Sequence, residues 1–221
     1  MRLCKVLPIP HTSVFKADCL TPGYQQISTT GDGNCFTNAF ALLLIDFGKR
    51  SKQDDRTALL HFLNNNSIGV TYDDRMFDQY SKLYEIQISY ILKHALVDYV
   101  ADDLDIHSED GRSNIHNIRL NMGNNAHHLS DQLVKNKYLK ELKTDGVWLG
   151  IESIHFMTDM LAKNGIVYNY GIHGDSFNGL SVFGKSSTLN KPLQMVDPSA
   201  YYALFNPNAK HWTLCVKSPP T

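Results

Sequence analysis

Two residues in this chain, one cysteine and one histidine, have the sequence surroundings that nucleophilic chemistry requires. Cys35 ends the tetrapeptide Asp32-Gly33-Asn34-Cys35, and His211 stands near the other end of the sequence. A thiol attacks a carbonyl carbon once a nearby base has removed its proton, and imidazole exchanges a proton near neutral pH. The two residues are far apart along the chain, so only the tertiary fold can bring them together. The pair predicts acyl-transfer chemistry.

The residues that follow Cys35 predict a helix that begins at the cysteine. Apolar side chains recur at helical spacing and share one face: Phe36, Phe40, Leu43, Leu44 and Phe47. Cys35 would then lie at the positive end of the helix dipole, which favours thiolate over thiol. The backbone N–H groups of Gly33, Asn34 and Cys35 are the candidate donors of an oxyanion hole.

His211 is the candidate base, and the sequence leaves open which residue orients its imidazole. In a triad, a third side chain holds the ring in the productive tautomer. Thr213 would lie on the same strand face as His211 and offers a hydroxyl in place of a carboxylate. Asn206 and Asn208 from the preceding turn, and Asp18 from the N-terminal segment, are alternatives. A plain dyad is also open, since a thiolate depends less than a serine on a third residue.

The chain resembles the OTU (ovarian tumour domain) family of cysteine proteases at three places. Residues 32–35 match the family's Asp-Gly-Asn-Cys block at the start of its central helix. His211 and Trp212 match a late histidine followed by an aromatic residue. A third similarity, to the family's Trp-Gly-x-x-Glu segment with imperfect spacing, lies at Trp148, Gly150 and Glu152. The resemblance covers residues 25–217 and implies a single catalytic domain over 1–221.

This resemblance implies both a fold and an activity. The fold would be α+β and papain-like, with a central helix that carries Cys35, a small and mostly antiparallel sheet, and further helices around them. The activity would be that of a deubiquitinase, a thiol-dependent isopeptidase that releases ubiquitin through a thioester on Cys35. In the family, the aspartate matched by Asp32 helps arrange the oxyanion loop. Many members carry Asp or Asn where this chain has Thr213, so the third catalytic residue differs here.

Ubiquitin or a polyubiquitin chain is the partner that the resemblance implies. Trp212, beside the base, is the candidate to line the channel for an extended tail. An acidic cluster stands where the family carries its variable ubiquitin-contacting region: Asp102, Asp103, Asp105, Glu109 and Asp110. Because acidic side chains suit an arginine-bearing tail, we expect residues 101–130 to contribute to ubiquitin binding.

Two other functions share these sequence features. The same Cys–His pair would serve another papain-like peptidase, a transglutaminase or a deamidase. A catalytically inactive ubiquitin-binding module is the third hypothesis, because position 213 lacks the usual Asp or Asn. Divergence outside the matched motifs favours a bacterial or viral effector that acts in the host cytoplasm.

Composition excludes several other classes of protein. Of the 221 residues, 43% are hydrophobic and 19% are charged, which is typical of a globular domain. A net charge of −1 argues against non-specific nucleic-acid binding, and the apolar runs are too short for a membrane span. The scattered cysteines, Cys4, Cys19, Cys35 and Cys215, predict reduced thiols in a cytosol-like compartment.

We expect a monomer that needs no cofactor and no metal. The polar stretch that is rich in histidine has no thiol pair at zinc-ligand spacing; its histidines are His107, His116, His127 and His128.

Hydrophobic periodicity and turn residues predict helices first and strands later. The helices are expected over 35–48, 54–62, 78–100, 130–142 and 152–163. The strands are expected over 166–170, 180–183, 201–205 and 211–216. Residues 1–28 are expected to be irregular with short extended pieces, and 101–125 to form a long loop or one more short helix.

Overall fold

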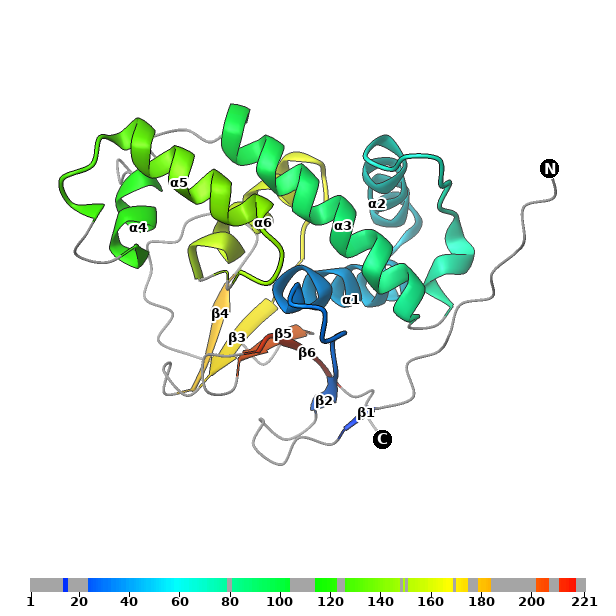
Figure 1. The fold of residues 1–221 in the computed structure, drawn as a ribbon. Coiled ribbons are helices and arrows are strands. Elements are labelled where there is room, and N and C mark those ends of the chain that lie inside the picture. Colours follow the sequence, from blue (N-terminus) through cyan, green and yellow to red (C-terminus); the bar gives the residue numbers. More distant parts are fainter. Residues whose placement is uncertain are drawn as a thin grey trace.

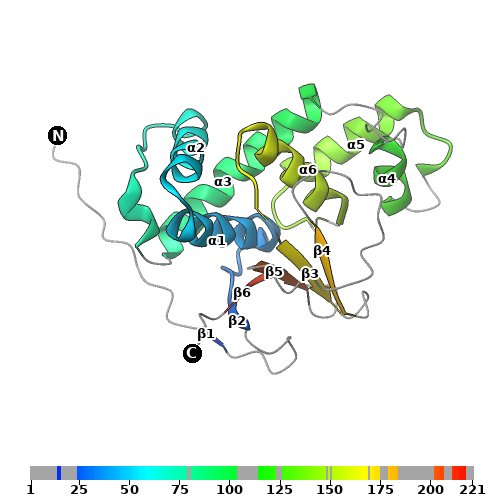
Figure 2. The same ribbon diagram turned by 180° about the vertical axis from the view of Figure 1, so that it is seen from behind.

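The fold is α+β, as the sequence predicted. The computed structural model describes residues 14–15, 24–78, 81–103, 114–122, 126–147, 149, 151–168, 170–174, 179–183, 202–206 and 211–217. Within these ranges the helices occupy the middle of the sequence, and most of the strands follow them. The helices lie together on one side of the sheet in both views (Figures 1 and 2).

The described helices follow most of the predicted ranges. They are α1 (Cys35–Arg50), α2 (Gln53–Asn65), η1 (Asp74–Phe77), α3 (Lys82–Asp98), η2 (Tyr99–Asp103), α4 (Asn114–Asn121), α5 (Asp131–Lys143) and α6 (Ile151–Lys163). Of these, η1 is a 3-10 turn and η2 is a π-helical turn that continues α3. Ser130 caps α5 by accepting from the N–H of Leu133 at 3.4 Å. Helix α4 lies within residues 101–125, for which the sequence predicted either a long loop or one more short helix.

One predicted helix starts later than expected. The helix predicted over 78–100 begins at Lys82, because Ser81 has extended backbone and its hydroxyl accepts from the N–H of Tyr84 at 3.5 Å. The residues immediately before it form η1, which Asp73 caps through the N–H of Arg75. The cap at Ser81 therefore starts α3 four residues later than the predicted start at residue 78.

The strand predicted over 166–170 is wrong for most of its length. Ile166 donates its N–H to the carbonyl of Leu161 at 2.9 Å, and Gly165 has a φ of 77°, so this segment ends α6. Tyr168 is buried against Phe47, with ring centroids 5.8 Å apart. These apolar residues pack in the helical layer. Buried segments of this kind have the same composition as a strand, so composition alone does not distinguish the two.

Six described strands form one mixed sheet. They are β1 (Val14–Phe15), β2 (Tyr24–Ile27), β3 (Tyr170–Gly174), β4 (Gly179–Phe183), β5 (Tyr202–Asn206) and β6 (Thr213–Lys217). Their order is β1-β2-β6-β5-β3-β4, and only β3 and β5 pair in parallel. The predicted mostly antiparallel character is confirmed. Strand β2, which precedes all the helices, pairs with β6, which follows them all.

Helix α1 is the centre of the molecule. It runs between the sheet and α3, and all its residues from Phe36 to Gly48 are buried (Figure 1). The apolar face predicted for this helix is therefore only part of its contact surface, since a helix enclosed on all sides has no solvent face. Asp46 tolerates this burial by accepting from Arg50 one turn later, at 2.6 Å. A helix fixed so firmly provides a rigid platform for Cys35 at its first position.

None of the described helices has the length and apolar composition that crossing a bilayer requires.

Candidate active site

The loop before α1 is held by the side chain of Asp32. Its Oδ1 accepts from the N–H of Asn34 at 2.9 Å and from Nδ2 of Asn38 at 2.8 Å. The first bond forms an Asx turn. It also corrects one expectation, because the N–H of Asn34 is engaged and is not available to an oxyanion. The N–H groups of Gly33 and Cys35 remain the candidate donors.

Cys35 occupies the first position of α1 and is partly exposed. Burial raises the pKa of its thiol above the ordinary value, although the backbone N–H groups of Trp212, Phe36 and Cys35 itself lower it. The nearby carboxylate of Asp32 raises the pKa further. The sequence predicted the opposite direction from the helix dipole alone, and desolvation outweighs that effect here. The resting thiol is therefore protonated and requires a base to become a nucleophile.

His211 lies beside the same loop and is held by a residue that the sequence analysis did not single out. Oγ1 of Thr29 is 2.9 Å from Nε2 of His211 and also donates to the carbonyl of Trp212 at 2.8 Å. The pairing of β2 with β6 explains this contact. Ile27 pairs with Leu214, and continuing the same register two residues beyond it places Thr29 opposite Trp212.

The contact with Thr29 fixes the tautomer of His211. The one hydrogen of the Thr29 hydroxyl is used on Trp212, so toward the ring the hydroxyl oxygen accepts, and Nε2 must carry the proton. In the neutral imidazole the lone pair is then on Nδ1. Thr29 thus does by hydrogen bonding what an orienting amide or carboxylate does in other triads, without supplying a negative charge.

A pocket of about 300 Å³ contains both chemical groups. It is lined by Gly31, Gly33, Asn34, Cys35, Phe36, Thr37, Lys93, Leu142, Thr144, Gly146, Val147, Leu149 and His211. The walls come from the loop before α1, from α3, and from the end of α5 with the segment that follows it. Glycines therefore form much of the wall beside the cysteine, and they leave room for a backbone to approach closely.

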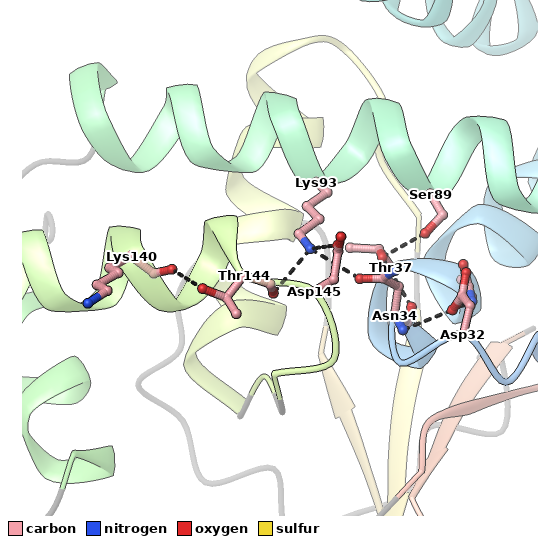
Figure 3. Close-up of polar contacts among 9 residues, drawn as sticks. Asp32, Asn34, Thr37, Ser89, Lys93, Lys140, Thr144 and Asp145 are labelled. Carbon is pink, nitrogen blue, oxygen red and sulfur yellow. Dashed lines mark hydrogen bonds and ion pairs between the residues drawn. The ribbon is translucent and has the colours of Figure 1, made fainter.

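Lys93 ties two of these walls together. Its Nζ donates to Oδ1 of Asn34 at 3.1 Å, to the carbonyl of Thr144 at 3.2 Å and to the carboxylate of Asp145 (Figure 3). The ammonium holds the pKa of Asp145 below its usual value through that hydrogen bond. Only 13% of the Lys93 side chain is exposed, so most of its length is packed between α3 and the loops.

Two glycines make the closest approach between those walls. Gly33 has a φ of 86°, and a Cβ built on it would lie 2.7 Å from the Cα of Gly146. Gly146 also has a positive φ, of 74°. No side chain fits at position 33 unless the facing backbone moves, so the shape of the pocket depends on glycine there.

The structure describes the side chain of one of the four candidates for the third catalytic residue, Thr213. Thr213 is buried in β6, and its hydroxyl accepts from Nε2 of Gln26 at 3.0 Å; the described hydrogen bond to the ring of His211 involves Thr29 instead. Asn206 ends β5. Asp18 and Asn208 lie outside the described residues.

Trp212 does not line the pocket, which corrects its expected contact with substrate. Only 2% of this residue is exposed. Its indole N–H donates to the carbonyl of Leu149 at 3.2 Å, and its ring packs edge-on against Phe36 with centroids 6.2 Å apart. Trp212 therefore supports the site from inside the core, because its ring links the segment before β6 to α1 and to the wall that contains Leu149.

The acidic cluster is only partly described. Asp102 is exposed and lies in η2 together with the backbone of Asp103. Asp102 lies nine residues after Lys93, which lines the pocket. At 1.5 Å per residue of helix, this places Asp102 roughly 13 Å along the helix axis from Lys93. Asp105, Glu109, Asp110, His107, Trp148 and Gly150 lie outside the described residues. Of the Trp-Gly-x-x-Glu segment, the described neighbours Val147 and Leu149 do line the pocket.

Among the described residues, no group of three or more histidine, cysteine or acidic side chains is arranged to hold a metal ion.

Comparison with known proteins finds similarity to solved structures. No protein-family model matches the chain, and no curated protein sequence matches it. The viral OTU domain protease from Farallon virus is similar over 87% of this chain and 83% of its own, with 18% identity and a TM-score of 0.40. An OTU deubiquitinase solved in complex with Ub-PA is similar over 89% of this chain and 75% of its own, with 12% identity and a TM-score of 0.39.

Proposed function

We propose that the chain is a cysteine-dependent deubiquitinase of the OTU type. One observation carries the proposal: Cys35 at the first position of α1 and His211 before β6 line the same pocket, with the imidazole held by Thr29. A nucleophile, a base and an orienting residue in one concave site are the parts that acyl transfer requires.

The reaction follows from these positions. Nδ1 of His211 takes the proton of Cys35 as the sulfur attacks the carbonyl carbon of the isopeptide bond. N–H groups of Gly33 and Cys35 stabilise the oxyanion of the tetrahedral intermediate. The intermediate collapses to a thioester, and the imidazolium gives its proton to the departing lysine amine. Water then attacks the thioester, His211 takes its proton, and the carboxylate leaves as the thiol is restored.

Ubiquitin is the proposed substrate because of the walls of the pocket. Gly31, Gly33 and Gly146 place backbone rather than side chains beside Cys35, which suits a slender tail that ends in glycine. The Asp-Gly-Asn-Cys block points the same way through its resemblance to the OTU family. The stretch 101–130, with exposed Asp102, is the proposed place for further contact with ubiquitin.

The test is reaction with ubiquitin that carries a C-terminal propargyl group. Wild-type protein is expected to form a covalent adduct that increases its mass by one ubiquitin, and Cys35→Ala is expected to form none. Cys215→Ala is the matched control, because Cys215 is the other described free cysteine and is fully buried in β6. His211→Ala is expected to slow adduct formation, since the thiol then has no base.

Other results identify the alternatives. A folded wild-type protein that binds ubiquitin without forming the adduct would be a binding module. A protein that neither binds nor reacts would be a peptidase or deamidase with another substrate, and the deubiquitinase proposal would be wrong.

A further inference from the structure

Glu85 is a fully buried carboxylate that contacts the loop of the active site. It lies in the first turn of α3, and its two oxygens accept from the N–H of Thr30 at 2.6 Å and from the hydroxyl of Thr30 at 2.8 Å. Burying a carboxylate is costly unless its oxygens are well bonded. These two bonds are charge-assisted, which makes them stronger than ordinary neutral hydrogen bonds.

Thr30 is held from a second side as well. Its carbonyl accepts from Nδ2 of Asn38 at 3.0 Å, and Asn38 is fully buried in α1. The same amide group also donates to Asp32, which forms the Asx turn before Cys35. Two buried side chains from two helices therefore determine where this loop lies.

The bond to the N–H of Thr30 has a direct effect on Thr29. A peptide group is planar, so the N–H of Thr30 shares one rigid unit with the carbonyl carbon of Thr29. When Glu85 fixes the direction of that N–H, it also fixes the backbone of Thr29, whose hydroxyl holds Nε2 of His211. The path from Glu85 to His211 is thus two hydrogen bonds and one peptide plane.

We propose that Glu85 is a positioning residue that aligns His211 with Cys35 through the Thr29–Thr30 peptide. This inference rests on the proposed function only insofar as Cys35 and His211 act as a pair. The bonds that carry this effect are those from Thr30 to the two oxygens of Glu85. The proposal predicts that the reactivity of the Cys35 thiol, in α1, depends on the carboxylate of Glu85, in α3.

The test measures alkylation of Cys35 by iodoacetamide as a function of pH, followed by mass spectrometry of the peptide that contains Cys35. Glu85→Met keeps the length of the side chain without its acceptors, and it is expected to lower the rate near neutral pH by about tenfold, the effect of one well-made hydrogen bond. The pH at which the rate rises is expected to move upward. Glu85→Gln retains an acceptor for the N–H of Thr30 and is expected to remain within about threefold of wild type.

A double-mutant cycle separates positioning from a general loss of structure. In a Thr29→Val background, Glu85→Met is expected to change the rate by less than about twofold, because both variants break the same path. A full tenfold loss in that background would overturn the proposal, as would a Glu85→Met variant that reacts like wild type. If Glu85→Met does not fold, Thr30→Val removes one bond only and takes its place, with Thr30→Ser as the variant expected to restore the rate.

Alkylation needs no ubiquitin, so this test stands apart from the proposed function. Coupling between Glu85 and Thr29 in a protein that ignores the ubiquitin probe would support the positioning role and reject the substrate. Cys35 that reacts identically with and without His211 would reject the catalytic pair and, with it, any positioning by Glu85.

Discussion

The hydroxyl of Thr29 lies 2.9 Å from Nε2 of His211 and gives its own hydrogen to the carbonyl of Trp212. A residue without charge therefore orients the candidate base. An uncharged partner holds the ring but stabilises the imidazolium less than a carboxylate does. Burial raises the pKa of the Cys35 thiol, so in the proposed mechanism the thiol requires that ring for its deprotonation.

We predict that Thr29→Val lowers kcat on a ubiquitin substrate by about tenfold and leaves KM within about twofold, because one hydrogen bond to the base is lost while the pocket walls remain. Thr29→Ser retains the hydroxyl and is the control. Steady-state kinetics on ubiquitin with a C-terminal fluorophore measures both parameters. A rise in KM at constant kcat would instead assign Thr29 to substrate binding.

Gly33→Ala is predicted to abolish most activity. A Cβ there would lie 2.7 Å from the backbone of Gly146, and the positive φ adds strain of about 1 kcal/mol. Gly69→Ala is the control for strain alone, because Gly69 has a φ of 73° with nothing within 4 Å of the added Cβ. Urea denaturation and turnover are measured for both variants. Equal loss of activity in the two would show that the contact with Gly146 is unimportant.

Lys93→Met is predicted to reduce turnover roughly fivefold, because the wall that contains Thr144 is then no longer tied to Asn34. Lys82→Met is the matched control, since Lys82 is an exposed lysine of the same helix. The effect of Lys93→Met is expected to fall as salt is added, because salt screens the pair that Lys93 forms with the exposed Asp145 in the wild type. Turnover measured at low and high ionic strength tests both statements.

His155 in α6 predicts a loss of stability in mild acid. Burial lowers the pKa of this histidine from 6.5 to about 4, so it stays neutral in the fold while the unfolded chain takes up a proton. The stability that it contributes is complete above pH 6.5 and is lost as the pH falls toward 4, by up to about 3 kcal/mol.

The measurement is the free energy of unfolding in urea at several pH values across that window. His155→Gln is expected to show a shallower decline than wild type, because glutamine takes up no proton. His127→Gln, at an exposed position, is the control and should follow wild type. Parallel curves for wild type and His155→Gln would refute the prediction.

Much of the framework could be predicted because local signals specify it. The block at 32–35 marks the start of a helix, and the apolar positions after it require that helix to be buried. Strand signals late in the chain similarly anticipated β4, β5 and β6. The wrongly predicted strand near Ile166 shows what composition alone cannot distinguish, since a capped helix end and a strand can contain the same residues.

The partners of the catalytic pair could not be predicted, because they depend on register. Thr29 reaches His211 only because β2 and β6 pair as they do, and no local pattern states that pairing. The sequence also does not show how deeply an individual side chain is buried. Burial reversed the expected direction of the Cys35 pKa and removed Trp212 from the pocket wall.

The pairing of β2 with β6 also sets the time at which the candidate pair of Cys35 and His211 can assemble during synthesis. Cys35 and its helix emerge from the ribosome early, whereas His211 arrives with the strand that follows all the helices. Until residues 211–217 have been made and have paired with β2, Cys35 has no imidazole from His211 beside it. The order of the elements along the chain thus delays assembly of the candidate site until the sheet is complete.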